Sequence, residues 1–251
     1  LASPVDSAVE IVNERGARIP GQVVGFENQH AMVMPLGPLE GIARGNAVRS
    51  TSTSQRVACS PLLVGRVIDA LGRPMDGKGP VKLPEHRRVN VRAVDCMRRV
   101  PIDAPIATGI RSVDGLLTCG LGQRMGIFAG PGVGKSTLMS MISKNTSAHV
   151  SVIALIGERG REVQDFLQHS LGEEGLRRAI VVVSTTSKVI GLGHVIASDI
   201  KHPNGNTFDQ VLLDGAAETI TAEGGKVMRT SFIDLNDDIV QVEFAGAGAL
   251  S

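Results

Sequence analysis

One short stretch constrains the fold of this chain more than any other: a glycine-rich loop between an apolar run and an amphipathic segment. The loop and its flanks, from Phe128 to Ser140, read FAGPGVGKSTLMS. Four residues separate Ala129 from a Gly-Lys-Ser triplet, as in a phosphate-binding loop whose first glycine is relaxed to alanine. Glycines let several backbone N–H groups converge on one anion, and the following helix adds the positive end of its dipole. The stretch therefore predicts a phosphate cradle rather than a simple turn.

The residue types in this loop also predict how a nucleotide would be held. Lys135 is expected to reach the β- and γ-phosphates, and the Ser136 hydroxyl is expected to coordinate Mg²⁺. ATP and Mg²⁺ are the ligands that this arrangement predicts. The expected binding residues form a continuous set: Gly130, Pro131, Gly132, Val133, Gly134, Lys135, Ser136 and Thr137.

Strand and helix patterns alternate around the loop, between residues 101 and 187. Short apolar runs at 124–129, 149–157 and 179–187 predict buried strands. Apolar residues at helical spacing predict helices at 134–147 and 161–171. Strands that alternate with helices in this order are typical of a mostly parallel sheet with crossover helices, so the fold class is α/β.

The two ends of the chain differ from this pattern. Residues 1–78 read as short strands with Gly- and Pro-containing turns, which indicates a small β-barrel domain, and residues 79–100 have the composition of a linker. Residues 101–187 then form a partial P-loop core. Residues 188–251 alternate apolar and polar side chains around turn signals, which predicts an antiparallel β-rich tail rather than more crossover sheet.

The composition argues against nucleic acid as a partner and against a membrane-spanning segment. The chain has 26 basic and 25 acidic residues and no Trp or Tyr, which argues against nucleic acid as a partner. Its three cysteines lie far apart, as expected of reduced thiols in a cytoplasmic protein. No apolar run approaches the roughly 18 residues of a membrane span, and the first residues carry no secretory-signal pattern. A cytoplasmic protein, at most peripheral to a membrane, is expected.

A charged loop, LIGERGRE, follows the second predicted strand at residues 155–162. A carboxylate at the carboxyl end of a strand, beside the phosphate loop, could orient an attacking water. That is the functional interpretation of Glu158. The alternative is a solvated charged loop without a chemical role, and the spacing alone leaves both interpretations open.

Three long motifs together resemble the type III secretion and flagellar export ATPases, which are relatives of the catalytic subunit of rotary ATP synthases. The motifs are GRVIDALGRPMDGKGP (65–80), PIATGIRSVDGLLTCGLGQRMGIFAGPGVGKST (105–137) and LIGERGREVQDF (155–166). The resemblance covers roughly residues 8–187. It implies an N-terminal β-barrel followed by a RecA-like ATPase domain, and three catalytic residues: Lys135 on the phosphates, Glu158 as the water-activating carboxylate, and Arg159 in the same loop. Ser136 is again the implied Mg²⁺ ligand.

The resemblance also implies a setting for the protein. Family members are homohexamers with nucleotide near subunit interfaces. They use ATP hydrolysis to unfold and export secreted proteins at the cytoplasmic face of a bacterial secretion apparatus. The implied partners are therefore other copies of the chain, secretion-apparatus proteins, and exported cargo with its chaperones.

Residues 188–251 depart from the family pattern. The family continues with a long helix, a strand ending in the Walker B aspartate, an arginine finger, an adenine pocket and a C-terminal helical domain, and none of these is recognisable here. Asp214 follows an apolar run, but the nearby Gly205 and Asn206 favour a hairpin over a Walker B strand. Three interpretations remain open: an incomplete export ATPase, a non-enzymatic nucleotide-binding or assembly module, or a truncated fusion product without turnover.

Overall fold

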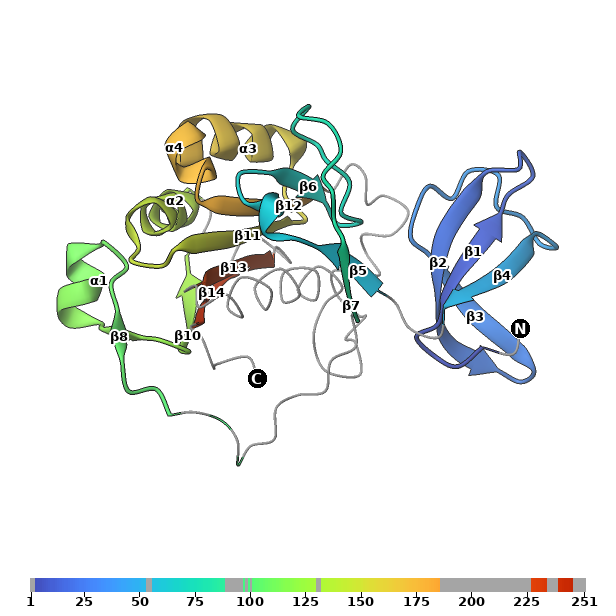
Figure 1. Cartoon of the computed structure of the whole chain (residues 1–251), viewed down its shortest axis with the longest axis horizontal. Helices are drawn as coiled ribbons and strands as arrows, with labels where there is room; N and C mark the ends of the chain where they lie inside the picture. The colour runs from blue at the N-terminus through green and yellow to red at the C-terminus, as the bar shows by residue number, and fades with distance from the viewer. Residues whose placement is uncertain are drawn as a thin grey trace.

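The computed structural model describes residues 3–52, 56–88, 97, 99, 101–129, 132–185, 227–233 and 239–245. Within these ranges the chain forms a four-stranded sheet near the N-terminus and a six-stranded sheet that carries a layer of helices (Figure 1). No helix in these ranges combines the length and the apolar character that crossing a membrane requires. The candidate Walker B residue Asp214 lies outside the described residues.

The N-terminal sheet is antiparallel, with the strand order β3-β2-β1-β4. Apolar side chains alternate along β1 and the first half of β2, so that Val9, Ile11, Ile19 and Val23 are buried. A bulge between Val23 and Gly25 disrupts the pairing of β2 with β3. The strands are β1 (Ala8–Val12), β2 (Arg18–Glu27), β3 (His30–Pro35) and β4 (Ala47–Ser52).

The six-stranded sheet has the order β10-β14-β13-β11-β12-β6. Strands β13, β11, β12 and β6 pair in parallel, whereas β14 is antiparallel to both of its neighbours. The mostly parallel sheet predicted from the sequence is thus present. Its strands are β6 (Val67–Asp69), β10 (Arg124–Phe128), β11 (Val150–Ile156), β12 (Ala179–Ser184), β13 (Val227–Ile233) and β14 (Ile239–Ala245).

Strand β11 is buried along all seven of its residues because both faces of the sheet are covered there. Ile153 and Leu155 belong to the apolar cluster beneath the helices. Val152 and Ala154 belong to a second cluster on the opposite face, with Cys59 and other residues of the segment that precedes β6. That segment contains strand β5 (Arg56–Cys59) and the short 3-10 helix η1 (Pro61–Leu63). Burial on both faces explains why β11 reads as a continuous apolar run.

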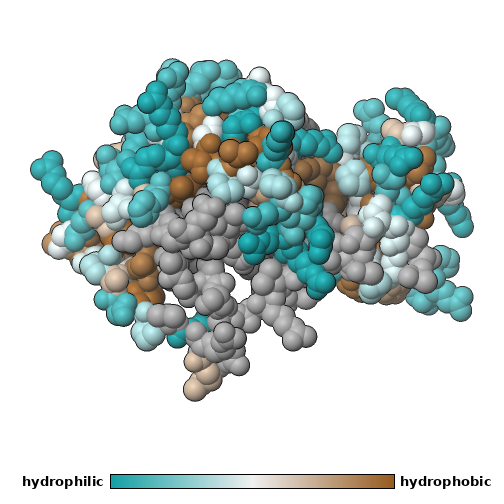
Figure 2. All heavy atoms as spheres, in the orientation of Figure 1, coloured by the Kyte–Doolittle hydropathy of each residue, from teal (hydrophilic) through white to brown (hydrophobic). Residues whose placement is uncertain are grey.

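The helical layer covers one face of the sheet (Figure 1). It consists of α2 (Lys135–Asn145), α3 (Gly160–Asp165), the π-helical segment η3 (Phe166–Leu171) and α4 (Gly172–Leu176). Its inward side chains include Met139, Ile142, Val163 and Phe166. Figure 2 shows hydrophilic residues over most of its outer surface. This division between an apolar inner side and a polar outer side matches the helical periodicity in the sequence.

Smaller elements complete the described fold. Strand β7 (Glu85–Arg88), within the segment expected as a linker, pairs with β5. Strand β8 (Pro105–Ile106) pairs with β9 (Cys119–Gly120), and helix α1 (Arg111–Leu116) lies between them in the sequence.

Two strand pairings differ from the expectations of the sequence analysis. Strand β6 was grouped with the N-terminal strands, but it pairs with β12 in the six-stranded sheet, with Val67 opposite Val181. Strands β13 and β14 form the expected antiparallel pair, yet they lie inside the six-stranded sheet, between β10 and β11. Both differences concern partners distant in sequence, which local periodicity does not specify.

Candidate functional site

The described part of the glycine loop has a backbone conformation that glycine adopts most readily. Gly132 and Gly134 have φ angles of 76° and 103°. A Cβ atom at either position would have no heavy atom within 4 Å, so the left-handed conformation, not crowding, favours glycine there. Gly130 and Pro131 lie outside the described residues. The loop is open to the space beside it, and Val133 is 73% exposed.

Helix α2 begins directly after this loop, with Gly134 as its N-cap and Lys135 as its first residue. Lys135 is half-buried, and Ser136 and Thr137 are exposed. The first turn of the helix contains no acidic side chain. The positive end of an eleven-residue helix therefore points toward the loop with no carboxylate from its own first turn to neutralise it.

The carboxyl end of β11 supplies the second part of the site. Gly157 follows the strand with φ of 76°, and its N–H donates to the carbonyl of Ser184 at the end of β12, 2.8 Å away. This turn places Glu158 at the edge of the sheet, half-buried, and Arg159 next to it as the N-cap of α3. The guanidinium of Arg159 donates to the carboxylate of Glu162 at 3.1 Å.

These parts surround one cavity of about 960 Å³. On one side lie the glycine loop and the start of α2, and on the other lie the loop after β11, α3 and η3. The structure thus brings the proposed phosphate lysine, the proposed metal ligand, the proposed catalytic carboxylate and the neighbouring arginine to one space. The sequence-predicted residues that line it are Gly132, Gly134, Lys135, Ser136, Thr137, Glu158 and Arg159.

The second wall of the cavity was missed by the sequence analysis. It carries polar and charged side chains from α3 and η3: Arg161, Glu162, Gln164, Asp165, Gln168, His169 and Ser170. The apolar periodicity correctly predicted a helix here, but it did not reveal the π-helical turn or which polar side would face the loop. π-helical turns are rare and often occur at functional sites.

The donor set fits a magnesium-bound nucleotide better than a metal ion alone. Within the described ranges, no three His, Cys, Asp or Glu side chains are grouped so that they could hold a metal ion. Mg²⁺ beside a nucleotide usually keeps few protein ligands and completes its coordination with phosphate oxygens and water. A single hydroxyl from Ser136, next to a lysine and a glycine cradle, is compatible with that mode.

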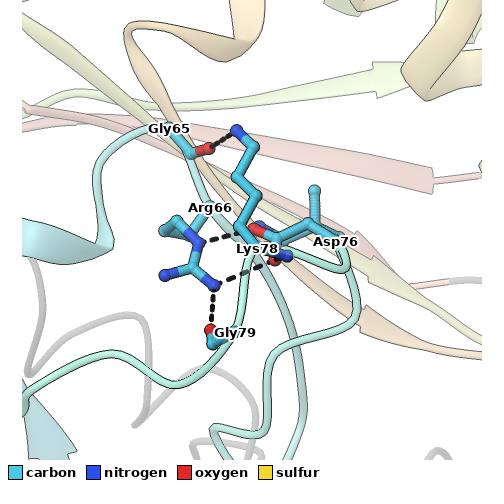
Figure 3. Close-up of polar contacts among 6 residues, drawn as sticks. Gly65, Arg66, Asp76, Lys78 and Gly79 are labelled. Atoms are coloured by element: carbon cyan, nitrogen blue, oxygen red, sulfur yellow. Dashed lines mark hydrogen bonds and ion pairs between the residues drawn. The ribbon is translucent and has the colours of Figure 1, made fainter.

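A largely buried ion pair between Arg66 and Asp76 lies directly before strand β6 (Figure 3). Nε and one terminal nitrogen of Arg66 donate to the two carboxylate oxygens of Asp76, at 2.6 and 2.9 Å. The Asp76 carboxylate also accepts the backbone N–H groups of Val67 and Lys78. The hydrogen bonds from Arg66 above all, together with these two, hold the pKa of Asp76 well below its usual range. The Lys78 ammonium in turn donates to the carbonyl of Gly65 at 3.0 Å.

A second carboxylate organises the loop that meets the far end of α2. Asp114 accepts the N–H and the hydroxyl of Thr108, at 2.8 and 2.6 Å, and the N–H of Gly109, at 3.0 Å. These hydrogen bonds, above all the one from the Thr108 hydroxyl, lower the pKa of Asp114. The hydroxyl of Thr146, just after α2, donates to the carbonyl of Ala107. The helix that presents Lys135 is therefore anchored at its opposite end.

Comparison with known proteins identifies the two parts of the fold. Residues 4–52 match the beta-barrel domain of the ATP synthase alpha/beta family, and residues 109–197 match its nucleotide-binding domain. The chain is 49% identical over 173 residues to a type 3 secretion system ATPase of Sinorhizobium fredii (strain NBRC 101917 / NGR234), covering 69% of this chain and 38% of that protein. It is 48% identical over 175 residues to the flagellum-specific ATP synthase of Bacillus subtilis (strain 168), covering 70% and 40%.

Solved structures of a type III secretion ATPase are also similar to this chain. The assembled ATPase EscN from the type III secretion system of enteropathogenic E. coli aligns with a TM-score of 0.73 and 31% identity, covering 92% of this chain and 52% of that chain. EscN in complex with its central stalk EscO aligns with a TM-score of 0.76, covering 91% and 53%. The chain spans about two fifths of the length of the curated relatives above. Its relatives above are a type 3 secretion system ATPase and a flagellum-specific ATP synthase. Through the two matched regions, which together exceed half of its residues, the chain belongs to the ATP synthase alpha/beta family.

Proposed function

We propose that this chain is the nucleotide-binding core of a bacterial protein-export ATPase, and that it binds ATP with Mg²⁺ in the cavity between α2 and α3. The observation that carries the proposal is the convergence of Lys135, Ser136 and Glu158 on one cavity beside a glycine cradle. A lysine at a helix N-terminus supports polyphosphate binding, and a carboxylate just after β11, lining the same cavity, supports hydrolysis.

Each residue has a distinct role in this proposal. The backbone amides around Gly132 and Gly134 and the ammonium of Lys135 bind the phosphates, and the hydroxyl of Ser136 holds Mg²⁺. When bound, Mg²⁺ neutralises part of the phosphate charge. Glu158 orients the water that attacks the terminal phosphate, and Arg159 stabilises the negative charge that develops there.

Two substitutions separate binding from hydrolysis. Lys135→Ala is expected to abolish ATP binding in calorimetric titrations, whereas Lys144→Ala, which removes the same charge from the last turn of α2, should preserve it. Glu158→Gln should preserve binding and abolish phosphate release. Phosphate release that is insensitive to both Lys135→Ala and Glu158→Gln would rule out this cavity as the active site.

A second function is favoured by the small share of the relatives' length that this chain matches. The chain matches only about two fifths of their length, so groups that related P-loop enzymes draw from other segments have no counterpart in the match. An arginine finger alone contributes about 10³ to 10⁵ in rate in such enzymes. The chain would then be a nucleotide-binding or assembly module without turnover. ATP binding that depends on Lys135, with no phosphate release above the Glu158→Gln background, would identify this case.

The partners are proposed by likeness to EscN, whose structures show it assembled and in complex with a central stalk. We extend this to self-association of the chain, as a hexamer, and to contact with proteins of a secretion apparatus at the cytoplasmic face of the membrane. Export of cargo, delivered with its chaperones, is the proposed use of the hydrolysed ATP. Sedimentation of the chain with and without Mg·ATP tests the proposed self-association.

A further inference from the structure

The end of α2 that lies farthest from the phosphate loop is held by the side chain of Arg178. One terminal nitrogen of its guanidinium donates to the carbonyl of Thr146 at 2.9 Å and to the carbonyl of Ala148. The other terminal nitrogen donates at 3.5 Å to the carbonyl of Lys144, in the last turn of α2. The last carbonyls of a helix have no partner within the helix, and a cation at this end is favoured by the helix dipole. The half-buried Arg178 therefore caps the C-terminal end of α2.

The backbone of Arg178 is attached to the central sheet at the same place. Arg178 directly precedes β12, and its carbonyl accepts the N–H of Ser151, in β11, at 2.8 Å. The hydroxyl of Ser151 in turn donates to the carbonyl of Ser143, in α2, at 3.3 Å, and both serines are fully buried. Arg178 thus connects the end of α2 with the start of β11.

These two elements carry the proposed nucleotide-binding residues at their other ends. Strands β10 and β11 run in the same direction, because β14 is antiparallel to both β10 and β13, and β13 is parallel to β11. Helix α2 crosses back between them. Lys135, at its start, and Glu158, just after β11, therefore lie at one edge of the sheet, and Arg178 lies at the opposite edge.

The length of α2 converts a small change at Arg178 into a larger one at the phosphate loop. An eleven-residue helix is about 16 Å long, so a tilt of about 5° at one end displaces the other end by more than about 1 Å. Displacements of this size are enough to misalign hydrogen-bond donors with a bound ligand. The position of Lys135 and of the glycine loop thus depends on how firmly the far end of α2 is held.

We propose that Arg178 is a positioning residue for nucleotide binding, which sets the place of the phosphate loop by fixing the far end of α2. The proposal rests on the proposed function, because it requires Lys135 and the glycine loop to bind phosphates. Arg178 is not among the residues that line the cavity, so it acts through the helix rather than on the ligand. The hydrogen bond from Thr146 to Ala107 remains without the guanidinium, so α2 stays formed but is displaced.

Calorimetric titration with Mg·ATP, well below the unfolding midpoint of each variant, tests the proposal. Arg178→Met removes the donors and keeps most of the side-chain length. It is expected to weaken binding by about three- to tenfold, the loss of roughly one hydrogen bond to the phosphates. The amide resonances of Gly132 and Gly134 should shift in the ligand-free variant. Arg177→Met is the matched control, because it removes the same charge from the exposed neighbouring residue, and its binding should stay close to that of the unchanged chain.

Two further variants separate positioning from stability and from charge. Arg66→Met breaks the largely buried ion pair beside β6, at the end of the sheet order opposite to β10. It should lower stability but leave Mg·ATP affinity and the loop resonances unchanged. Arg178→Lys keeps the charge but offers one ammonium to three carbonyls, so it should restore binding only in part.

Several results would overturn the positioning role. Arg178→Met could bind Mg·ATP as Arg177→Met does, or Arg66→Met could weaken binding equally. Full restoration by Arg178→Lys would also overturn it, because charge alone would then be sufficient. Where Arg178→Met does not fold, Arg178→Lys decides: weaker binding than in the unchanged chain supports the role, and equal binding contradicts it.

The same titrations keep this proposal distinct from the proposed function. In each of the cases above the unchanged chain still binds Mg·ATP, so the proposed function survives the loss of the positioning role. Failure of the unchanged chain to bind Mg·ATP would instead overturn the proposed function, and the positioning role with it.

Discussion

At the scale of single residues, a largely buried ion pair joins Arg66 and Asp76 beside β6, the edge strand of the six-stranded sheet. The side chains are 12% and 6% exposed, so each charge is stabilised mainly by the opposite charge and little by water. Arg66→Met should lower the free energy of unfolding by about 1–3 kcal/mol, because it leaves a largely buried carboxylate with only backbone donors. Urea denaturation followed by circular dichroism measures the loss.

A matched variant tests whether the pair, rather than the packing, is responsible. Replacing both partners, with Arg66→Met and Asp76→Leu together, removes the buried charges and should recover part of the lost stability. Exposed Arg18, which pairs with Glu10 at 3.3 Å, is the control, and Arg18→Met should change stability by less than about 1 kcal/mol. Equal losses for Arg66→Met and Arg18→Met would contradict the argument.

The ionisation of Asp76 makes the stability of the folded chain depend on pH. The pKa of Asp76 is lower in the folded chain than in the unfolded chain, mainly because Arg66 donates to it. Its contribution is therefore fully present above the unfolded value of about 4 and is lost as the pH falls below that value. Between pH 7 and pH 3.5, the unchanged chain should lose more stability than Asp76→Asn does. Parallel urea midpoints for the two proteins would contradict this.

At the scale of elements, the end of α2 is fixed by a close approach of the loop before α1. Gly109 has φ of +77°, and a Cβ built on it would lie 2.2 Å from the Cβ of Asn145. Gly109→Ala must therefore strain the backbone and also push the loop away from the helix that presents Lys135. Gly16 has almost the same φ, +75°, with nothing within 4 Å, so Gly16→Ala reports the backbone strain alone.

The two alanine variants should differ by the cost of the clash. Gly16→Ala is expected to cost about 1–2 kcal/mol, and Gly109→Ala a further ~1–3 kcal/mol for overpacking. Thermal unfolding of the two variants measures the difference. Equal losses would show that the loop moves away freely and does not anchor α2.

The elements around the phosphate loop could be predicted because their signals are local. Apolar runs predicted β10, β11 and β12, and apolar residues at helical spacing predicted α2 and α3. The expected burial was correct for β11 and β12 but wrong for β10, whose residues alternate between exposed and half-buried. The pairing of Val67 with Val181 could not be predicted, since a three-residue strand carries no information about a partner more than a hundred residues away. The ion pair of Arg66 with Asp76 and the polar side of α3 were missed for the same reason: both depend on how the chain packs.

At the scale of the whole molecule, the tail and the nucleotide-binding core share one sheet. In the described residues, β10, which leads into the phosphate loop, pairs with β14 alone, and β14 pairs in turn with β13. The structural match to EscN covers 92% of the chain, whereas the sequence match to the curated relatives above covers about 70%. Strands β13 and β14 therefore lie in the six-stranded sheet although they lie beyond residue 197, where the family match ends.

This arrangement predicts what happens when the tail is removed. In a variant that ends at residue 226, the backbone amides of β10 lose the partner strand that protects them. Their hydrogen exchange should accelerate by about tenfold or more, since exchange reports the free energy of local opening. Within the part of the chain that the structure describes, strands β1 and β2 pair only within their own sheet, and their amides should exchange as before. A variant that ends at residue 245 keeps β13 and β14 and serves as the matched control.

If both variants showed unchanged exchange in β10, the tail would contribute nothing to the nucleotide-binding core. If β10 alone loosened, ATP binding should weaken with it, because the same strand leads directly into the phosphate loop.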